Sequence, residues 1–135
     1  MKLEEAVTYV ANRFEYEADP NFSKYLDTWQ VLPLIDDKFK GDCDDFALTC
    51  LWYYSGENRF KFLWNLLITH KYKLYRAKTY NGRWHIIGCV GDKWFDNWTR
   101  KVHDKENFLR LTKHEIKMRY YSPMFLLFLI NGLIK

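Results

Sequence analysis

Apolar residues near the start of the chain recur with the spacing of an amphipathic helix. They are Leu3, Ala6, Val7, Val10 and Phe14. Intervals of three and four residues place them on one stripe of a helix. The Asp-Pro-Asn sequence at residues 19–21 is typical of a turn. The pattern therefore predicts a helix over residues 3–17 that packs on the core through this stripe.

The clearest helix start lies in GDCDDFAL, residues 41–48. Asp42 has the residue type of an N-cap, and Asp45 follows three residues later, as in a capping box. Gly56 is suited to end a helix. The sequence predicts a helix from Cys43 to Tyr54, with the cysteine at its N-terminus.

The middle of the chain has the strand and turn signals of an antiparallel sheet. A helical or apolar segment at 60–68 precedes three predicted strands, at residues 72–79, 83–90 and 93–99. Asn81-Gly82 and Gly91-Asp92 are the expected hairpin turns between them. Helices before the strands and a meander of strands together predict an α+β fold.

Two further helix starts are predicted toward the C-terminus. Thr112-Lys-His-Glu115 has the pattern of a capping box. Ser122-Pro123 offers a serine cap with proline at the first helical position, before an apolar run. No repeat divides the chain, so we expect a single domain over residues 1–135.

Charge is unevenly distributed between the two halves. Residues 1–60 carry 6 Lys and Arg against 12 Asp and Glu, and residues 61–135 carry 15 against 5, which gives −6 and +10. The basic residues are scattered rather than clustered. This favours an acidic lobe packed against a basic one within a single domain.

The cysteines indicate a reducing compartment, and the hydropathy of the chain bears on export and on membrane insertion. The three cysteines are an odd number, with no spacing typical of a disulfide framework. The first residues lack the apolar run of a signal peptide. The longest apolar run, Met124 to Ile130, is far shorter than the roughly 20 residues of a membrane span. We therefore expect a cytoplasmic location and no membrane span.

Cys43 is the candidate nucleophile. At a helix start, unpaired backbone N–H groups and the positive dipole end stabilise a thiolate, although the acidic neighbours of Cys43 oppose this. Cys50 and Cys89 lack such a position and are expected to be small core residues. The sequence thus predicts one reactive thiol, whose acidic neighbours disfavour the thiolate that the helix start favours.

A nucleophilic cysteine also needs a histidine, and the histidine needs an orienting group. If Gly91-Asp92 is a two-residue turn, Asp96 is a diagonal neighbour of the strand residue His85, about 7 to 8 Å away between backbone positions. A loop one residue different would place Asn97 there instead. The other histidines, for which a solvated surface role is predicted, are His70, His103 and His114.

A zinc site built from cysteines and His85 is not expected. On one strand His85 and Cys89 would lie about 13 Å apart. Along one helix Cys43 and Cys50 would lie about 10.5 Å apart. Neither pair can share one ion, so the spacing argues against structural zinc.

The segments GDCDDFAL and RWHIIGCVGDKWFDNW resemble the bacterial transglutaminase-like cysteine peptidases, in the papain-like and transglutaminase superfamily. The resemblance covers about residues 25–100. It implies a papain-like core with the nucleophile at the N-terminus of a central helix on a small antiparallel sheet. It further implies Cys43 as nucleophile, His85 as base and Asp96 as orienting residue. Short members occur in bacteriophages, so a compact bacteriophage-type protein in the host cytoplasm is expected.

The resemblance also implies accessory groups. Backbone amides at the helix start would hold the oxyanion, with a further donor from Trp29 or Gln30 and with Asn97 as a neighbouring contact. In some members acidic residues beside the nucleophile bind calcium, and Asp42 and Asp44 match these places. Helix capping by Asp42 and Asp45 is slightly favoured over calcium, and no cofactor is required for the chemistry.

The expected function is a thiol hydrolase, a peptidase or amidase that cleaves a peptide or amide bond through an acyl-enzyme. Acyl transfer to an amine and an inactive homologue are variants of this hypothesis. The alternative is a non-catalytic module that binds nucleic acid or a host protein through its basic aromatic half. The residues behind it are Lys71, Lys73, Arg76 and Lys78, around Tyr72 and Tyr75.

A solvated strand edge is the favoured interpretation of this basic segment, because charged edges discourage aggregation. The expected partner is therefore a peptide or protein substrate rather than nucleic acid. The sequence does not predict an oligomeric state.

Overall fold

The computed structural model describes residues 2–17, 30–121 and 123. Within them, helices combine with an open antiparallel sheet, which confirms the predicted α+β class. The helices are α1 (Leu3–Ala11), α2 (Cys43–Tyr54), α3 (Arg59–Leu63), the π-helical η1 (Trp64–Ile68) and α4 (Lys105–Thr112). The strands are β1 (Phe14–Tyr16), β2 (Phe39–Gly41), β3 (Tyr72–Lys78), β4 (Trp84–Val90), β5 (Lys93–Phe95) and β6 (Glu115–Arg119).

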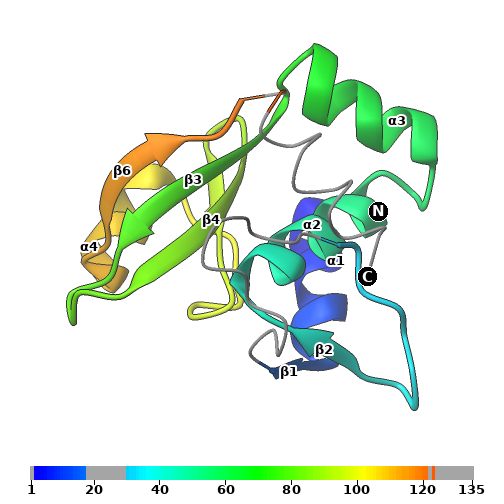
Figure 1. Cartoon of the computed structure of the whole chain (residues 1–135), viewed down its shortest axis with the longest axis horizontal. Helices are drawn as coiled ribbons and strands as arrows, with labels where there is room; N and C mark the ends of the chain where they lie inside the picture. Colours follow the sequence, from blue (N-terminus) through cyan, green and yellow to red (C-terminus); the bar gives the residue numbers. More distant parts are fainter. Residues whose placement is uncertain (1, 18–29, 122, 124–135) are drawn as a thin grey trace.

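The main sheet has four strands in the order β5-β4-β3-β6, and every neighbouring pair is antiparallel. β3 and β4 form the hairpin predicted around Asn81-Gly82. The strands β1 and β2 pair in parallel in a separate short ladder. In Figure 1 this ladder lies below α1 and α2, away from the main sheet.

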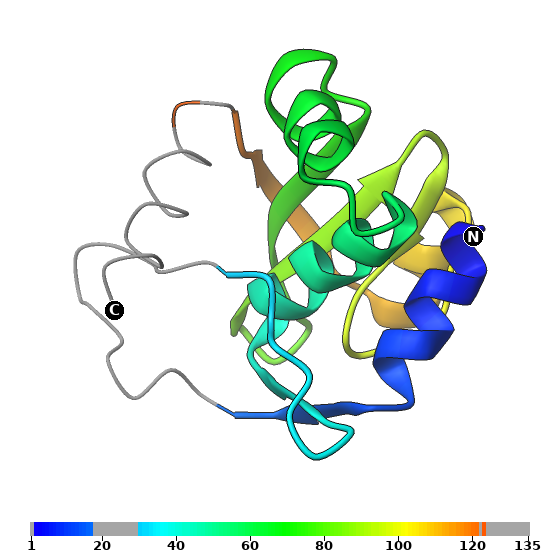
Figure 2. The ribbon, with the colours of Figure 1, turned by 90° about the vertical axis from the view of Figure 1, so that its right-hand side faces the viewer.

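Helices cover both faces of the main sheet (Figures 1 and 2), with α1 and α2 on one face and α4 on the other. From β4, Ile86 and Val90 join the core cluster that includes α2. Ile87 and Cys89 pack with Phe108 of α4 in the second cluster. Because β4 is covered on both faces, most of its residues are buried, and its sequence lacks the alternation of a half-exposed strand.

The first helix is shorter than predicted. Its apolar stripe is buried up to Val10, but the helix ends at Ala11, and residues 14–16 form β1. Phe14 is buried from this strand, where it pairs with Phe39. Phe14 continues the helical spacing of apolar residues although it belongs to a strand. The spacing therefore predicted a helix that is too long.

The entry of the chain into α2 passes through Gly41, at a position without room for a side chain. A Cβ there would lie 2.8 Å from Oδ2 of Asp45 and 2.8 Å from Cδ2 of Leu32. On the other side, Gly41 pairs with Tyr16 of β1. This packing fixes where α2 begins and hence where Cys43 lies.

The β4–β5 hairpin has the predicted register. Val90 pairs with Lys93 across the Gly91-Asp92 turn. The strand stops before Asp96 rather than at residue 99, because the Asp96 carboxylate accepts the backbone N–H of Thr99 at 2.8 Å and turns the chain. Asp96 therefore lies at the end of β5, beside β4.

The predicted capping box at residues 112–115 is wrong. Thr112 is the last residue of α4, and its hydroxyl donates to the carbonyl of Phe108 at 2.8 Å. Lys113 adopts a left-handed conformation with φ 57°, which ends the helix. Glu115 then begins β6 on the edge of the sheet.

The helix predicted after Ser122-Pro123 lies, apart from Pro123 itself, outside the described residues. Among the helices that the structure describes, none is long and apolar enough to cross a membrane.

Candidate active site

The first turn of α2 is capped as predicted. Oδ1 of Asp42 accepts the N–H of Asp45 at 3.4 Å, and Oδ2 of Asp45 accepts the N–H of Asp42 at 3.5 Å. Oδ1 of Asp45 also accepts the N–H of Gln30 at 3.1 Å. The capping interactions hold the helix start and bring the chain at Gln30 against it.

Cys43 is the first residue of α2 and is partly exposed, whereas Cys50 and Cys89 are buried, as predicted. Burial, followed by the charges of Asp44 and Asp42, raises the pKa of the Cys43 thiol well above its usual value. The backbone N–H groups of Ile86 and Asp44 lower this pKa, but by less. Burial, together with the acidic neighbours, therefore outweighs the backbone N–H groups at the helix start, and the resting thiol is protonated.

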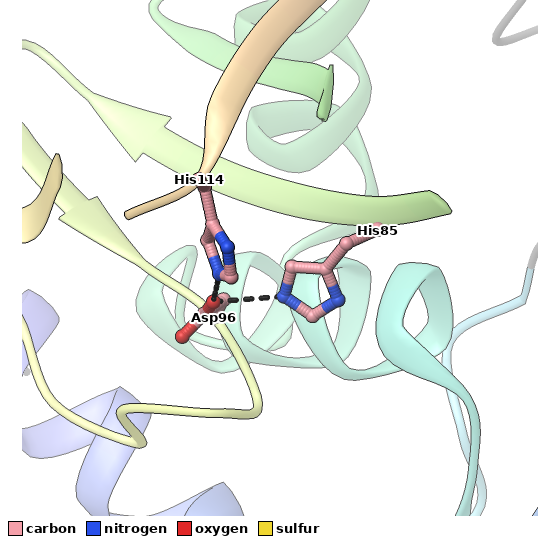
Figure 3. Close-up of side chains that lie close together, drawn as sticks. All are labelled: His85, Asp96 and His114. Atoms are coloured by element: carbon pink, nitrogen blue, oxygen red, sulfur yellow. Dashed lines mark hydrogen bonds and ion pairs between the residues drawn. The ribbon is translucent and has the colours of Figure 1, made fainter. Parts of the chain in front are cut away.

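His85 and Asp96 are joined as the predicted register requires. Nε2 of His85 lies 2.8 Å from Oδ2 of Asp96, and both residues are buried (Figure 3). The ring of Trp98 packs on His85 with its centroid 5.4 Å away. Because Nε2 is engaged with the carboxylate, the other ring nitrogen, Nδ1, points away from Asp96.

His114 also belongs to this group, and the prediction of a solvated surface role for it is wrong. Its side chain has no exposed surface, and its Nε2 lies 2.9 Å from the same oxygen of Asp96 (Figure 3). The residue lies between α4 and β6, where its backbone N–H donates to the hydroxyl of Thr112 at 3.2 Å. No sequence spacing links residue 114 to residue 96, because β6 and α4 reach the site by tertiary packing.

Four hydrogen-bond contacts reach the Asp96 carboxylate. Oδ2 faces the two histidines, while Oδ1 accepts the N–H of Thr99 at 2.8 Å and lies 3.0 Å from its hydroxyl. Burial acts to raise the pKa of Asp96, but the hydrogen bonds of His114 and His85, with that of Thr99, hold it well below its usual range. Asp96 is therefore a buried carboxylate that stays ionised.

Cys43 reaches β4 beside the histidine but is not hydrogen-bonded to it. The backbone N–H of Ile86, the residue after His85, interacts with the sulfur. Among the described residues, no hydrogen bond joins the sulfur to His85. In proteins without substrate such catalytic contacts are often long and tighten on binding. The structure thus places Cys43 beside His85 and Asp96. Of the two hydrogen bonds that such a group requires, the described residues make the one between His85 and Asp96.

Tyr16 is a neighbour of the thiol that the sequence did not indicate. Burial and then the charges of Cys43 and Asp42 raise its pKa, which places its phenol near both. Arg83 lowers the same pKa and therefore also lies nearby. Tyr16 is 60% exposed. Its pairing with Gly41 explains this position, but that contact depends on the unexpected strand β1.

The predicted oxyanion contacts have different outcomes. Gln30 lies at the first turn of α2 through its backbone bond to Asp45. Trp29 lies outside the described residues. Within the described part of the chain, the buried Oδ1 of Asn97 has no hydrogen-bond partner, and it is Asp96 rather than Asn97 that bonds His85.

Two groups of side chains have the donor types of a metal site. Carboxylate oxygens of Asp42, Asp44 and Asp45 lie within 4.8 Å of one another. Asp42 and Asp45 serve as helix caps, and calcium at Asp42 and Asp44 stays a prediction. His85, Asp96 and His114 form the second group. Here the Nε2 atoms of both histidines lie at hydrogen-bond distance from Oδ2 of Asp96.

The basic strand is central in the sheet, so its interpretation as a strand edge is wrong. Tyr72 is buried, and Tyr75 stacks on Trp94 with centroids 4.8 Å apart. Arg76 and Lys78 lie over the ring of Trp84, at 3.9 and 4.5 Å from its centroid. These contacts engage the rings of Tyr75 and Trp84, while Trp84 stays 50% exposed.

Comparison with known proteins adds no identification. No protein-family model matches the chain, and no curated protein matches it significantly. The chemistry of the site therefore rests on the residues and contacts described above.

Proposed function

We propose that the protein is a thiol hydrolase in which Cys43 is the nucleophile, His85 the general base and Asp96 the orienting residue. The observation that carries the proposal is the buried hydrogen bond between His85 and Asp96, at a point where the start of α2 brings Cys43 against β4. The resemblance to transglutaminase-like cysteine peptidases, with their papain-like core, supports the same roles.

The protonation of the thiol determines the first step. Because the resting thiol is protonated, its proton passes to Nδ1 of His85 as the sulfur attacks the substrate carbonyl. Asp96 stabilises the imidazolium that forms. The scissile C–N bond then breaks, and the leaving amine takes the proton from His85.

Water completes the reaction. His85 accepts a proton from water, the resulting hydroxide attacks the thioester, and the proton returns to the sulfur as the C–S bond breaks. The N–H of Asp45 is taken by the Asp42 carboxylate, but the N–H of Cys43, the first residue of α2, has no intrahelical acceptor and is suited to hold the oxyanion. The Gln30 side chain is the candidate second donor, since its backbone is fixed to α2. The products are a carboxylic acid and an amine.

An activated ester tests the roles without knowledge of the natural substrate. With p-nitrophenyl acetate, we expect a burst of nitrophenol and an acetyl adduct on Cys43, detected by mass spectrometry of the intact and digested protein. Cys43→Ala should abolish both. Cys50→Ala is the matched control, because Cys50 is buried in the same helix and should change neither. A burst that persists in Cys43→Ala would refute the proposal.

A further inference from the structure

The second histidine on Asp96 is the part of this cluster that a Cys-His-Asp arrangement leaves unexplained. His114 is fully enclosed and makes its single side-chain hydrogen-bond contact, among the described residues, with Oδ2 of Asp96. Burial of a polar ring is unfavourable unless it is bonded. A purely apolar residue would fill this place beside Phe108 and Trp98 without that cost.

The contacts of His114 define its tautomer. Among the described residues, its buried Nδ1 has no hydrogen-bond partner. A bare N–H in this position would cost more than a bare lone pair, so the proton belongs on Nε2, where it faces a carboxylate oxygen. His114 is therefore a donor to Asp96 through Nε2–H. His85 donates to the same oxygen through its own Nε2.

We propose that His114 is a positioning residue, which holds Asp96 ionised and aligned on His85 and thereby sets how strongly Asp96 stabilises protonated His85. The proposal rests on the function proposed above. A carboxylate oxygen that accepts two N–H groups has its charge shared between them. Asp96 therefore acts on protonated His85 with a shared rather than a full charge.

Among the described residues, titratable groups meet this cluster from several elements. Asp96 after β5 and His85 on β4 contact His114 directly or through its ring. Cys43 at the start of α2 meets β4 at the next residue, with Asp42 and Asp44 beside it. From α4 the neighbour is the ring of Phe108, which carries no charge.

Two amide variants of matched chemistry separate positioning from simple filling of space. His114→Gln can place an amide N–H where Nε2 lies, whereas the shorter His114→Asn cannot reach Asp96. For His114→Asn we expect about a tenfold lower kcat/KM on the ester, carried by kcat, with the acid limb of the pH profile about half a unit higher. His114→Gln should recover activity to within about threefold and restore the limb. Equal losses in both variants, with an unmoved limb, would overturn the proposal.

Two spectroscopic readouts decide the question without activity. In the unmodified protein, nitrogen NMR of the imidazoles should show His114 as the neutral Nε2–H tautomer, and an Nδ1–H tautomer would overturn the proposal. The carboxyl carbon of Asp96 should titrate at higher pH in His114→Asn than in His114→Gln, and identical titrations would count against it. If the protein lacks ester hydrolysis altogether, the proposed function fails, while these measurements still test the His114–Asp96 bond.

Discussion

Asp96 and Asp45 are both buried carboxyl groups beside the candidate site, yet their pKa values move in opposite directions. Burial acts to raise both. At Asp96, the hydrogen bonds of His114, His85 and Thr99 prevail and lower the pKa. At Asp45, the charge of Asp42 and a hydrogen bond with it add to burial, so the pKa is raised despite the N–H of Gln30.

The difference shows that donors rather than depth decide where this protein holds negative charge. The histidine side of the site is built around a stable anion. On the thiol side, several carboxyl groups lie close together, and their negative charges repel one another and the thiolate of Cys43. A site of this kind keeps its nucleophile protonated until the base removes the proton during attack.

The largest expected effect comes from removing the stable anion. Asp96→Asn should lower the rate of the acylation burst by about 10³- to 10⁴-fold, because a neutral amide neither stabilises protonated His85 nor fixes its tautomer. Stopped-flow measurement with p-nitrophenyl acetate checks this. Asp92→Asn, in the exposed β4–β5 turn, is the control and should match the unmodified protein. A folded Asp96→Asn protein with an unchanged burst would show that the anion is not needed.

The sequence predicted the His85–Asp96 pair because a hairpin couples them locally. Two residues in the turn fix the register, and the register fixes which side chains are neighbours. The contact of His114 was not predictable, because it depends on α4, which begins after its cap at Asp104, and on the chain that follows this helix. The polar residues around His114 in the sequence suggested that it is exposed, but tertiary packing buries its side chain.

The helix start at Cys43 was predictable for a similar reason. Asp42, Asp45 and Gly41 are adjacent in sequence and act on one another directly. The strand β1 was not predictable, since its three residues gain order by pairing with residues 39–41. Its consequence, an exposed Tyr16 next to the thiol, could not follow from spacing alone.

A smaller effect, on stability, is expected from Asp45, whose pKa is raised where that of Asp96 is lowered. Since the pKa of Asp45 is raised on folding, its contribution to stability is present below about pH 4 and is lost as pH rises toward neutrality. Asp45→Asn cannot titrate, but keeps an oxygen for the N–H of Gln30. We expect the loss in free energy of unfolding between pH 4 and neutrality to shrink by at least about 1 kcal/mol.

Urea unfolding across this pH range measures the effect of Asp45→Asn. Asp36→Asn, at an exposed turn position, is the control and should keep the pH dependence of the unmodified protein. Asp96 supplies the opposite sign, because its lowered pKa gives stability that is present above about pH 4 and is lost in acid. A profile that Asp45→Asn leaves unchanged would mean that Asp45 is ionised in the folded protein.

The smallest effect tests how Asp44 acts on the thiol. After burial, the charge of Asp44 is the largest cause of the raised pKa of Cys43, so Asp44→Asn should lower this pKa. Each unit lowered gives ten times more thiolate at neutral pH, but a less basic thiolate reacts more slowly, for a net gain of about threefold. Iodoacetamide alkylation of Cys43, followed by mass spectrometry, measures it, with Asp36→Asn as control. An unchanged rate in Asp44→Asn would show that the charge of Asp44 does not act on the thiol, and would leave burial and the charge of Asp42 as the causes of its raised pKa.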